Sequence, residues 1–183
     1  MILSLTLMLA GGPGAAPPAP AIDRPIAVVA RPLSADAMLA SAERRVRSGN
    51  MRITKLLSDG VRRSRTFADL VTALHQTNVI VYVEPSNTLA PEIAGRILLQ
   101  AVAGAQRYLR VQVRATLPGD QMISVIAHEL RHALEVADDP AVVDDHGLMV
   151  LYRRIGHVTY GADGFDTDAA RETGKRVRNE LMG

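Results

Sequence analysis

Two histidines that lie four residues apart, within an apolar segment of helical periodicity, constrain this chain more than any other feature. They are His128 and His132, in the sequence His-Glu-Leu-Arg-His. Because side chains four residues apart lie on the same face of an α-helix, both rings can direct a nitrogen atom at one point. The surrounding apolar residues recur at helical spacing and predict that this helix packs against a core: Ile123, Ile126, Leu130, Ala133, Leu134 and Ala137.

The residue that follows the first histidine is Glu129, which completes an H-E-x-x-H pattern. In this pattern two imidazoles bind a tetrahedral Zn²⁺ through bonds of about 2.0–2.1 Å. The glutamate projects beside the metal, where it can hold a water molecule and accept its proton. We therefore predict that His128 and His132 bind zinc and that Glu129 is a general base. The alternative is an ordinary amphipathic helix whose histidines are solvated or satisfied within the core.

The composition fits a single domain of 183 residues with an aliphatic core. Apolar residues make up 48% of the chain and aromatic residues only 3%, so leucine, valine, isoleucine, alanine and methionine must fill the core. The 21 basic and 19 acidic residues are too balanced to indicate a nucleic-acid-binding surface. The chain has no cysteine, which excludes disulfides, a thiolate nucleophile and cysteine-ligated zinc.

The N-terminal residues are typical of a secretory signal peptide. The apolar run at residues 1–10 is too short to span a bilayer. Small residues follow it, and Ala19-Pro20-Ala21 is a candidate signal-peptidase site, although no lysine or arginine precedes the run. We therefore predict export to the periplasm or the medium, with no membrane span after the signal peptide is removed. The alternative is an apolar tail on a cytoplasmic protein.

These features divide the chain into a signal peptide at 1–21, a linker at 22–50 and a catalytic domain at 51–183. The linker is rich in proline and alanine and cannot bury enough apolar surface to fold. Within it, a short helix is predicted over residues 35–47, because Ser-Gly-Asn at 48–50 is a stop signal.

The sequence from Met51 onward predicts an α+β fold. Apolar residues at helical spacing continue to about His75, as one helix or as two that join near residues 58–60. A β-branched run over residues 78–84 then predicts a buried strand. A helical segment before a small sheet is therefore expected.

A β-hairpin and three further helices complete the predicted order. The runs at 96–102 and 108–114 flank a glycine-containing turn, and the second run alternates apolar and polar residues. The helix of the two histidines begins near Asp120, a candidate N-cap, and ends near Pro140, which has no amide hydrogen. Two helices are predicted after it, over residues 142–155 and from residue 165 or 166 to 181.

A peptidase site needs a third protein ligand and an open position for water. The downstream candidates are Asp144, Asp145, His146, His157, Asp163, Asp166, Asp168 and Glu172. His146 lies on a polar helix face and is set aside. In the last predicted helix, Asp168 and Glu172 lie on the solvated face. Asp166 lies on the buried face with Ala169, Ala170, Thr173, Val177 and Leu181. We predict that Asp166 is the ligand; alternatively, it is the helix N-cap.

These features together resemble the gluzincin metallopeptidases, in which H-E-x-x-H supplies two ligands and the base, and an acidic residue on a later helix supplies the third ligand. The stretch from Phe165 to Ala169 is similar to the F-E-x-x-A sequence that carries this ligand in membrane gluzincins of the CAAX prenyl protease type. Asp166 replaces the glutamate of that sequence. Ala170 replaces an aspartate that usually braces a ligand histidine. The predicted order of elements over residues 51–181 also resembles the minimal gluzincin scaffold, without membrane helices.

The resemblance implies a zincin-like fold and two further features of the site. The strand before the metal helix, residues 108–114, would line the cleft and pair with an extended peptide substrate. Its alternative is an ordinary amphipathic strand. His157 and Tyr160 precede the third ligand and are candidates to stabilise the oxyanion. Their alternative role is that of ordinary loop residues.

The predicted function is an exported, zinc-dependent metallopeptidase that hydrolyses peptide or protein substrates. Zn²⁺ held by His128, His132 and Asp166 would activate a water molecule, and Glu129 would accept its proton. The first alternative is a metal-stabilised binding domain that keeps the zincin scaffold without catalysis. The second is a polyanion-binding surface built on basic residues otherwise expected to form a solvated turn: Arg62, Arg63 and Arg65.

Overall fold

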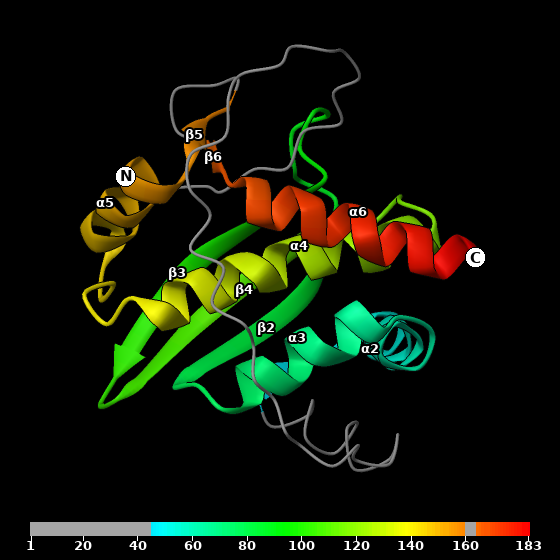
Figure 1. Ribbon diagram of the computed structural model, residues 1–183, viewed down its shortest axis with the longest axis horizontal. Coiled ribbons are helices and arrows are strands. Elements are labelled where there is room, and N and C mark those ends of the chain that lie inside the picture. The colour runs from blue at the N-terminus through cyan, green and yellow to red at the C-terminus, as the bar shows by residue number, and fades with distance from the viewer. Residues whose placement is uncertain (1–44, 160–163) are drawn as a thin grey trace.

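The computed structural model describes residues 45–159 and 164–183 of the chain. The described residues form a mixed α+β fold, as the sequence predicts (Figure 1). They comprise a four-stranded sheet, a two-stranded sheet and five helices. The predicted signal peptide at 1–21 and most of the predicted linker at 22–50 lie outside the described residues. No helix within the described part of the chain is long and apolar enough to cross a membrane.

The larger sheet has the strand order β1-β2-β4-β3. Strand β1 (Val46–Arg47) lies parallel to β2 (Val79–Ser86), and β2 lies parallel to β4 (Gln106–Arg114). Strand β3 (Gly95–Ala103) pairs antiparallel with β4 across a turn at Gly104, whose φ of 58° suits glycine. The predicted buried strand and the predicted hairpin are therefore confirmed.

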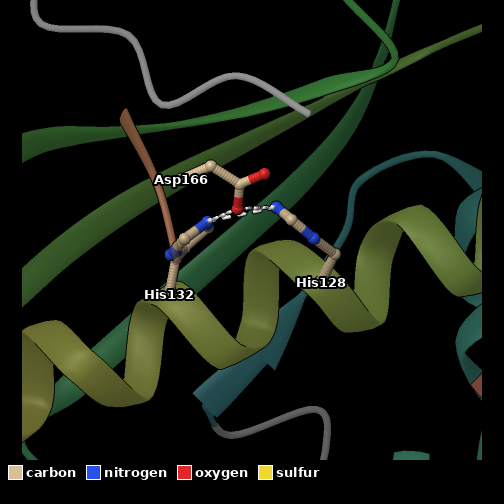
Figure 2. A group of neighbouring side chains, drawn as sticks. All are labelled: His128, His132 and Asp166. Atoms are coloured by element: carbon tan, nitrogen blue, oxygen red, sulfur yellow. Dashed lines mark hydrogen bonds and ion pairs between the residues drawn. The ribbon is translucent and has the colours of Figure 1, made fainter. Parts of the chain in front are cut away.

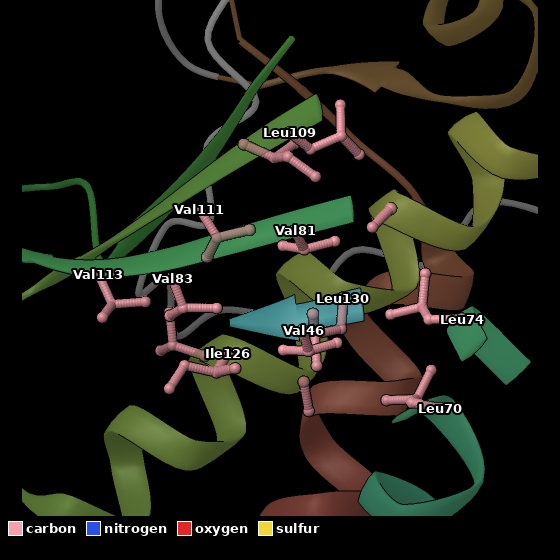
Figure 3. Packing of buried hydrophobic residues seen from close by; sticks show 14 of the residues in the cluster. Val46, Leu70, Leu74, Val81, Val83, Leu109, Val111, Val113, Ile126 and Leu130 are labelled. Atoms are coloured by element: carbon pink, nitrogen blue, oxygen red, sulfur yellow. The ribbon is translucent and has the colours of Figure 1, made fainter. Parts of the chain in front are cut away.

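The alternation predicted along β4 is also present. Leu109, Val111 and Val113 are buried, whereas Arg110 and Gln112 are partly exposed on the other face. Figure 3 shows the buried side chains of the sheet packed against those of the helices. One face of the sheet therefore carries the hydrophobic core, which fixes the helices above it.

Strand β4 is an interior strand, which corrects the prediction that residues 108–114 form a substrate-binding edge. It is paired with β2 on one side and with β3 on the other, so its backbone offers no free edge to a peptide. The outer strand on this side of the sheet is β3. Alternation of apolar and polar residues shows which face of a strand is solvated, but it does not show the position of the strand in the sheet.

Two helices precede β2, namely α2 (Met51–Arg63) and α3 (Arg65–His75). The sequence predicts one helix or two that join near residues 58–60. The structure has two, and they join at Ser64, whose side chain accepts the N–H of Phe67 at the start of α3. Gly60 remains helical. A Cβ atom there would lie 3.0 Å from the ring of Phe67, so this glycine permits close packing of the two helices instead of breaking one.

Strand β1 falls within the range predicted as a short helix, residues 35–47. Val46 pairs with Val81 of β2 and is buried, so the last two residues of that range form a strand. The described fold therefore begins before Met51, the predicted start of the domain. A strand of two residues has no periodicity of its own, and only its partner β2, which follows two helices later, defines it.

Helix α4 (Gly119–Asp138) carries the two histidines, lies across the sheet and has α6 packed along it (Figure 1). Its C-terminus is close to the predicted position. This end is fixed by Arg107, a buried residue of β4 that donates hydrogen bonds to the carbonyl groups of Val136, Ala137 and Asp139. The last carbonyl groups of a helix have no partner within it, so Arg107 satisfies them.

The prediction of Asp120 as the N-cap of α4 is wrong. The N-cap is Pro118, and Asp120 lies in the first turn, where it accepts hydrogen bonds from Arg63 at 2.6 and 2.9 Å. A negative charge in the first turn interacts favourably with the helix dipole. Asp120 can therefore stabilise the start of the helix without capping it.

Helix α5 (Asp145–Ile155) begins later than the predicted residue 142. The side chain of Asp144 accepts the N–H of Gly147 and thereby caps this helix, so the preceding residues are excluded from it. Gly156 follows the last helical residue, as predicted.

A two-stranded antiparallel sheet separates α5 from the last helix. It consists of β5 (His157–Val158) and β6 (Phe165–Asp166), and α6 (Asp168–Met182) follows. The prediction that the last helix starts at residue 165 or 166 is therefore wrong. Thr167 caps α6 by accepting the N–H of Ala170, because its extended backbone lets the hydroxyl reach that group.

Candidate metal centre

His128, His132 and Asp166 converge on one point and form a group that could hold a metal ion (Figure 2). The histidines come from one face of α4, and Asp166 comes from β6. The two Nε2 atoms are 3.1 Å apart, and Oδ1 of Asp166 lies 3.3 Å from Nε2 of His128 and 3.6 Å from Nε2 of His132. All three residues are buried, with 1% or less of their surface exposed.

Asp166 reaches this group from a strand, whereas the sequence predicts a helix. Its alternative role as helix N-cap is wrong, because Thr167 occupies that position. Of the other candidates for the third ligand, Asp163 lies outside the described residues. Within residues 45–159 and 164–183, none of the remaining candidates joins the group.

The carboxylate of Asp166 presents one oxygen to the histidines and the other to an arginine. Oδ2 accepts a hydrogen bond from Nε of Arg171 at 2.7 Å. Burial acts to raise the pKa of Asp166, but the neighbouring rings of His132 and His128 and the hydrogen bond from Arg171 outweigh it, and the pKa lies below its ordinary value of 3.8. Asp166 is therefore ionised and offers a single oxygen, Oδ1, at the point where the three residues meet.

The pKa values of the two histidines are shifted in opposite directions. Burial lowers the pKa of His128, and the charge of His132 lowers it further. Burial also acts to lower the pKa of His132, but the neighbouring carboxylate of Asp166 and the hydrogen bond to Glu135 outweigh it and raise this pKa. Without a cation the group therefore retains a proton on His132. A metal ion would take the place of this proton, because a histidine must be deprotonated to act as a ligand.

Each histidine is also held by a contact outside the group. Nδ1 of His132 lies 2.7 Å from Oε2 of Glu135, and Oε1 of Glu135 accepts a hydrogen bond from the hydroxyl of Thr167 at 2.7 Å. The ring of His128 lies beside the backbone of Ala170, which acts to raise its pKa. The gluzincin resemblance implies an aspartate brace at position 170, which this chain lacks. The Glu135 side chain braces the ring of His132, and the Ala170 backbone lies beside the ring of His128.

Glu129 is fully buried beside this group, with 0% of its surface exposed. Neither of its carboxylate oxygens has a hydrogen-bond partner among the described residues. Burial raises the pKa of Glu129 to about 8, against the opposing charge of His132. An unpartnered buried polar group costs about 1–3 kcal/mol, and more when it is charged. Such a group is a signal of function, because the fold alone gains nothing from it.

The first residue of β3, Gly95, lies against the carboxylate of Glu129. A Cβ atom at this position would lie 2.8 Å from Oε1 of Glu129 and 2.6 Å from Cγ1 of Val125. Real Cβ atoms do not approach so closely, so glycine is required here for the strand and the carboxylate to coexist. The outer strand of the sheet therefore begins at the candidate base.

Three residues of the site were not predicted from the sequence. Glu135 lies three residues after His132, so helical spacing could have identified it as a contact. Thr167 could have been identified as an N-cap, since threonine favours that position. Tyr152 is buried on α5, and its hydroxyl donates to the carbonyl of His132 at 3.3 Å. No sequence signal separates Tyr152 from the other apolar residues of that helix.

The two candidates for oxyanion stabilisation have different outcomes. His157 pairs with Asp166 in the β5–β6 ladder, and side chains of directly paired residues project from the same face. Its Nε2 atom is buried and has no hydrogen-bond partner among the described residues. Tyr160 lies outside the described residues. A role for His157 in catalysis stays a prediction.

The basic residues considered as a polyanion-binding surface are engaged with acidic groups of the same chain. Arg62 forms an ion pair with Asp59, and Arg63 forms one with Asp120. Arg65 lies 3.9 Å from Asp69. The positive charges are therefore largely compensated within the fold, which favours the interpretation of a solvated basic turn.

Comparisons of the chain with protein-family models, with curated proteins and with solved structures find no match. The resemblance to gluzincins therefore rests on the residues described above.

Proposed function

We propose that this protein is a zinc-dependent metallopeptidase with a zincin-like fold. Zinc bonds of about 2.0–2.1 Å in a tetrahedral site place the ligand atoms about 3.3–3.4 Å from one another. The corresponding separations among His128, His132 and Asp166 are 3.1, 3.3 and 3.6 Å. Two imidazoles and one carboxylate are also the donor set of many catalytic zinc sites, which leave a fourth position open. The spacing and the donor set therefore support zinc.

The observation that carries the proposal is the buried, unpartnered carboxylate of Glu129. A structural zinc site is closed by four protein ligands and needs no additional acid. Here three candidate ligands are accompanied by a carboxylate whose oxygens make no contact with a donor of the described chain. This arrangement suits a base that binds a water molecule next to the metal.

Each residue of the group then has a distinct role. His128 and His132 would hold the metal through Nε2, and Asp166 through Oδ1. When bound, zinc supplies a Lewis acid that brings the pKa of a water molecule to about 7. Glu129 accepts the proton of the attacking water and delivers it to the leaving amine. Arg171 retains Oδ2 of Asp166 by a hydrogen bond, so that this carboxylate contributes a single ligand atom.

We further propose that peptide or protein substrates bind along β3. An extended peptide can add to the outer strand of a sheet through main-chain hydrogen bonds. β3 is the outer strand, and its first residue, Gly95, contacts Glu129. A peptide paired with this strand would run past the general base. The balanced charge of the chain gives no support for a nucleic-acid substrate.

Export completes the proposal. The apolar N-terminal run and the small residues that end at Ala21 support a signal peptide. The absence of cysteine is compatible with this location, since an exported protein can fold without disulfides.

Metal analysis and a cleavage assay with the full-length protein test the proposal. The purified wild type should contain zinc and cleave a peptide library. Glu129→Gln should retain zinc and lose cleavage, whereas His128→Ala and His132→Ala should lose both. Absence of zinc from the wild type, or cleavage by Glu129→Gln at the wild-type rate, would refute the proposal.

A second candidate function is a metal-stabilised binding domain without turnover. The burial of all four side chains favours it, because Glu129, His128, His132 and Asp166 each expose 1% of their surface or less. A substrate must reach the base and the metal, whereas a structural site can be closed. A zinc-loaded protein that leaves the library intact, with a melting temperature that falls on addition of a chelator, would support this function.

A further inference from the structure

Residues 166–170, which join β6 to α6, make three separate contacts with the candidate metal group. Asp166 supplies a ligand atom. Thr167 donates to Glu135, which contacts Nδ1 of His132. The backbone of Ala170 lies beside the ring of His128. One short segment therefore contacts both histidines, directly or through Glu135, and provides the third ligand.

Thr167 is the centre of these contacts. Its N–H donates to Oδ1 of Asp166 at 2.7 Å, and its hydroxyl donates to Oε1 of Glu135 at 2.7 Å. The same hydroxyl accepts the N–H of Ala170 at 3.1 Å and so caps α6. Thr167 and Glu135 expose only 3% and 7% of their surface. A buried chain of hydrogen bonds thus connects the ligand, the brace and the start of α6.

Glu135 determines which nitrogen of His132 faces the metal group. Because Nδ1 contacts Oε2 of Glu135, Nε2 is directed at Asp166 and His128. A carboxylate on the second nitrogen of a ligand histidine fixes the orientation of the ring and raises its basicity. The other oxygen of Glu135 is held by Thr167, so the brace is itself positioned by α6.

Helices α6 and α4 also approach each other closely beside the metal group. A Cβ atom at Gly174 of α6 would lie 3.2 Å from the carbonyl oxygen of Ser124 and 3.3 Å from Cβ of His128. The first turns of α6 therefore lie directly on the part of α4 that carries the first histidine. Movement of α6 away from α4 would displace Asp166, Thr167 and Ala170 together.

We propose that Glu135 and Thr167 are positioning residues that couple metal binding to the docking of β6 and the N-terminus of α6 on α4. This inference rests on the proposed function only in that the group binds zinc; it does not require catalysis. Zinc binding should therefore order this segment, and loss of the Thr167–Glu135 hydrogen bond should weaken zinc binding although no ligand is changed.

The opposite end of α6 provides a matched control. There the hydroxyl of Thr66 donates to Oε1 of Glu180 at 2.6 Å. This hydrogen bond joins the same two residue types as the bond between Thr167 and Glu135. The Thr66–Glu180 pair also holds α6 to the rest of the fold, but it does not belong to the group of His128, His132 and Asp166. Substitutions at the two pairs therefore separate positioning of the metal group from general anchoring of the helix.

The test measures zinc affinity of the full-length protein by competition with a chromophoric chelator, together with the visible spectrum of the Co²⁺ form. Glu135→Gln and Thr167→Val should each weaken zinc binding by about 10–100-fold and alter the Co²⁺ spectrum. Thr167→Ser keeps the hydroxyl and should restore both. Glu180→Gln and Thr66→Val should leave affinity and spectrum unchanged. Amide hydrogen exchange should show that zinc protects residues 166–170 in the wild type, and less so in Thr167→Val.

Three outcomes would overturn the coupling. Wild-type zinc affinity in Glu135→Gln and Thr167→Val would do so while leaving the proposed peptidase intact. Equal weakening by Thr66→Val and Thr167→Val would show that any anchor of α6 has the same effect. A wild type that binds neither zinc nor Co²⁺ would overturn the coupling and the proposed function together.

Discussion

Gly95 and Glu129 lie against each other, although they come from the outer strand β3 and from helix α4. A Cβ atom added to Gly95 would lie 2.8 Å from Oε1 of Glu129. The missing side chain thus lets the start of β3 approach the carboxylate that we propose as the general base. The same contact places the proposed substrate strand and the proposed base side by side.

The first prediction concerns Gly95→Ala. The added methyl group would push Glu129 or β3 from its position, since overpacking of a buried site costs about 1–3 kcal/mol. The three candidate ligands are not touched, so zinc content should stay at the wild-type level. A displaced base should lower kcat/KM by about tenfold or more. Metal analysis and cleavage kinetics measure the two effects.

Gly49→Ala is the control, because a Cβ atom there meets nothing within 4 Å. Full activity of Gly95→Ala would contradict the proposed role of this contact.

The second prediction concerns Arg107, which holds the C-terminal end of α4. Its guanidinium donates to the carbonyl oxygens of Val136, Asp139 and Ala137 at 2.6, 2.7 and 3.0 Å. Arg107→Met removes all three hydrogen bonds from this buried site. The carbonyl groups of Val136 and Asp139 then keep only the longer bonds from the N–H groups of Asp139 and Val142, at 3.3 and 3.2 Å. We expect a loss of about 3 kcal/mol or more in the free energy of unfolding, measured by urea denaturation.

Arg52→Met is the control for Arg107→Met. Arg52 also donates to two carbonyl groups, those of Ala115 and Leu117, but it is exposed at the surface. Water can replace its hydrogen bonds, so the loss in the free energy of unfolding should be below about 1 kcal/mol. If the two substitutions had equal effects, burial of Arg107 would not be the reason for its importance.

The part of the site that lies on one helix could be predicted from the sequence. His128 and His132 are related by the geometry of a single helix, and their convergence follows from their spacing and the apolar residues around them. Local patterns also indicated the buried strand, the hairpin and the end of α4. In each of these cases the pattern and the structure it predicts lie within one continuous segment.

Features that depend on distant segments could not be predicted in the same way. The placement of β4 inside the sheet depends on β2, which precedes the hairpin in the sequence. The strand conformation of Asp166 depends on pairing with His157, and the helical pattern that begins at Asp168 extends backwards over Asp166 when the chain is considered alone. The N-cap at Thr167 is a local signal that determines the true start of α6.

The third prediction is that zinc binding releases a proton. In the absence of a cation, the carboxylate of Asp166 and the hydrogen bond to Glu135 raise the pKa of His132 against the effect of burial. Near neutral pH this ring is therefore protonated, and it must lose the proton to bind a metal. Calorimetric titrations with zinc in buffers of different ionisation enthalpy should show release of at least one proton at pH 7, that of His132. The carboxyl of Glu129, whose pKa burial raises to about 8, releases a second proton when it ionises beside the cation. Zinc affinity should fall as the pH is lowered, and release of no proton would contradict the assignment of His132 as a ligand.

The fourth prediction concerns the pH dependence of stability at Glu180. Burial acts to raise the pKa of this residue, but hydrogen bonds from Ser64 and Thr66 outweigh it and lower the pKa below its ordinary value of 4.5. A carboxylate with a lowered pKa in the folded state stabilises the protein above its unfolded pKa, and this contribution is lost as the pH falls through the folded value.

Glu180→Gln should therefore reduce the free energy of unfolding by roughly 1 kcal/mol at pH 7. The difference from the wild type should persist down to about pH 5 and shrink below about pH 4. Urea denaturation across this range measures it, with Glu172→Gln, a change at an exposed position of the same helix, as the control. A difference that grows as the pH falls would contradict the sign of this effect.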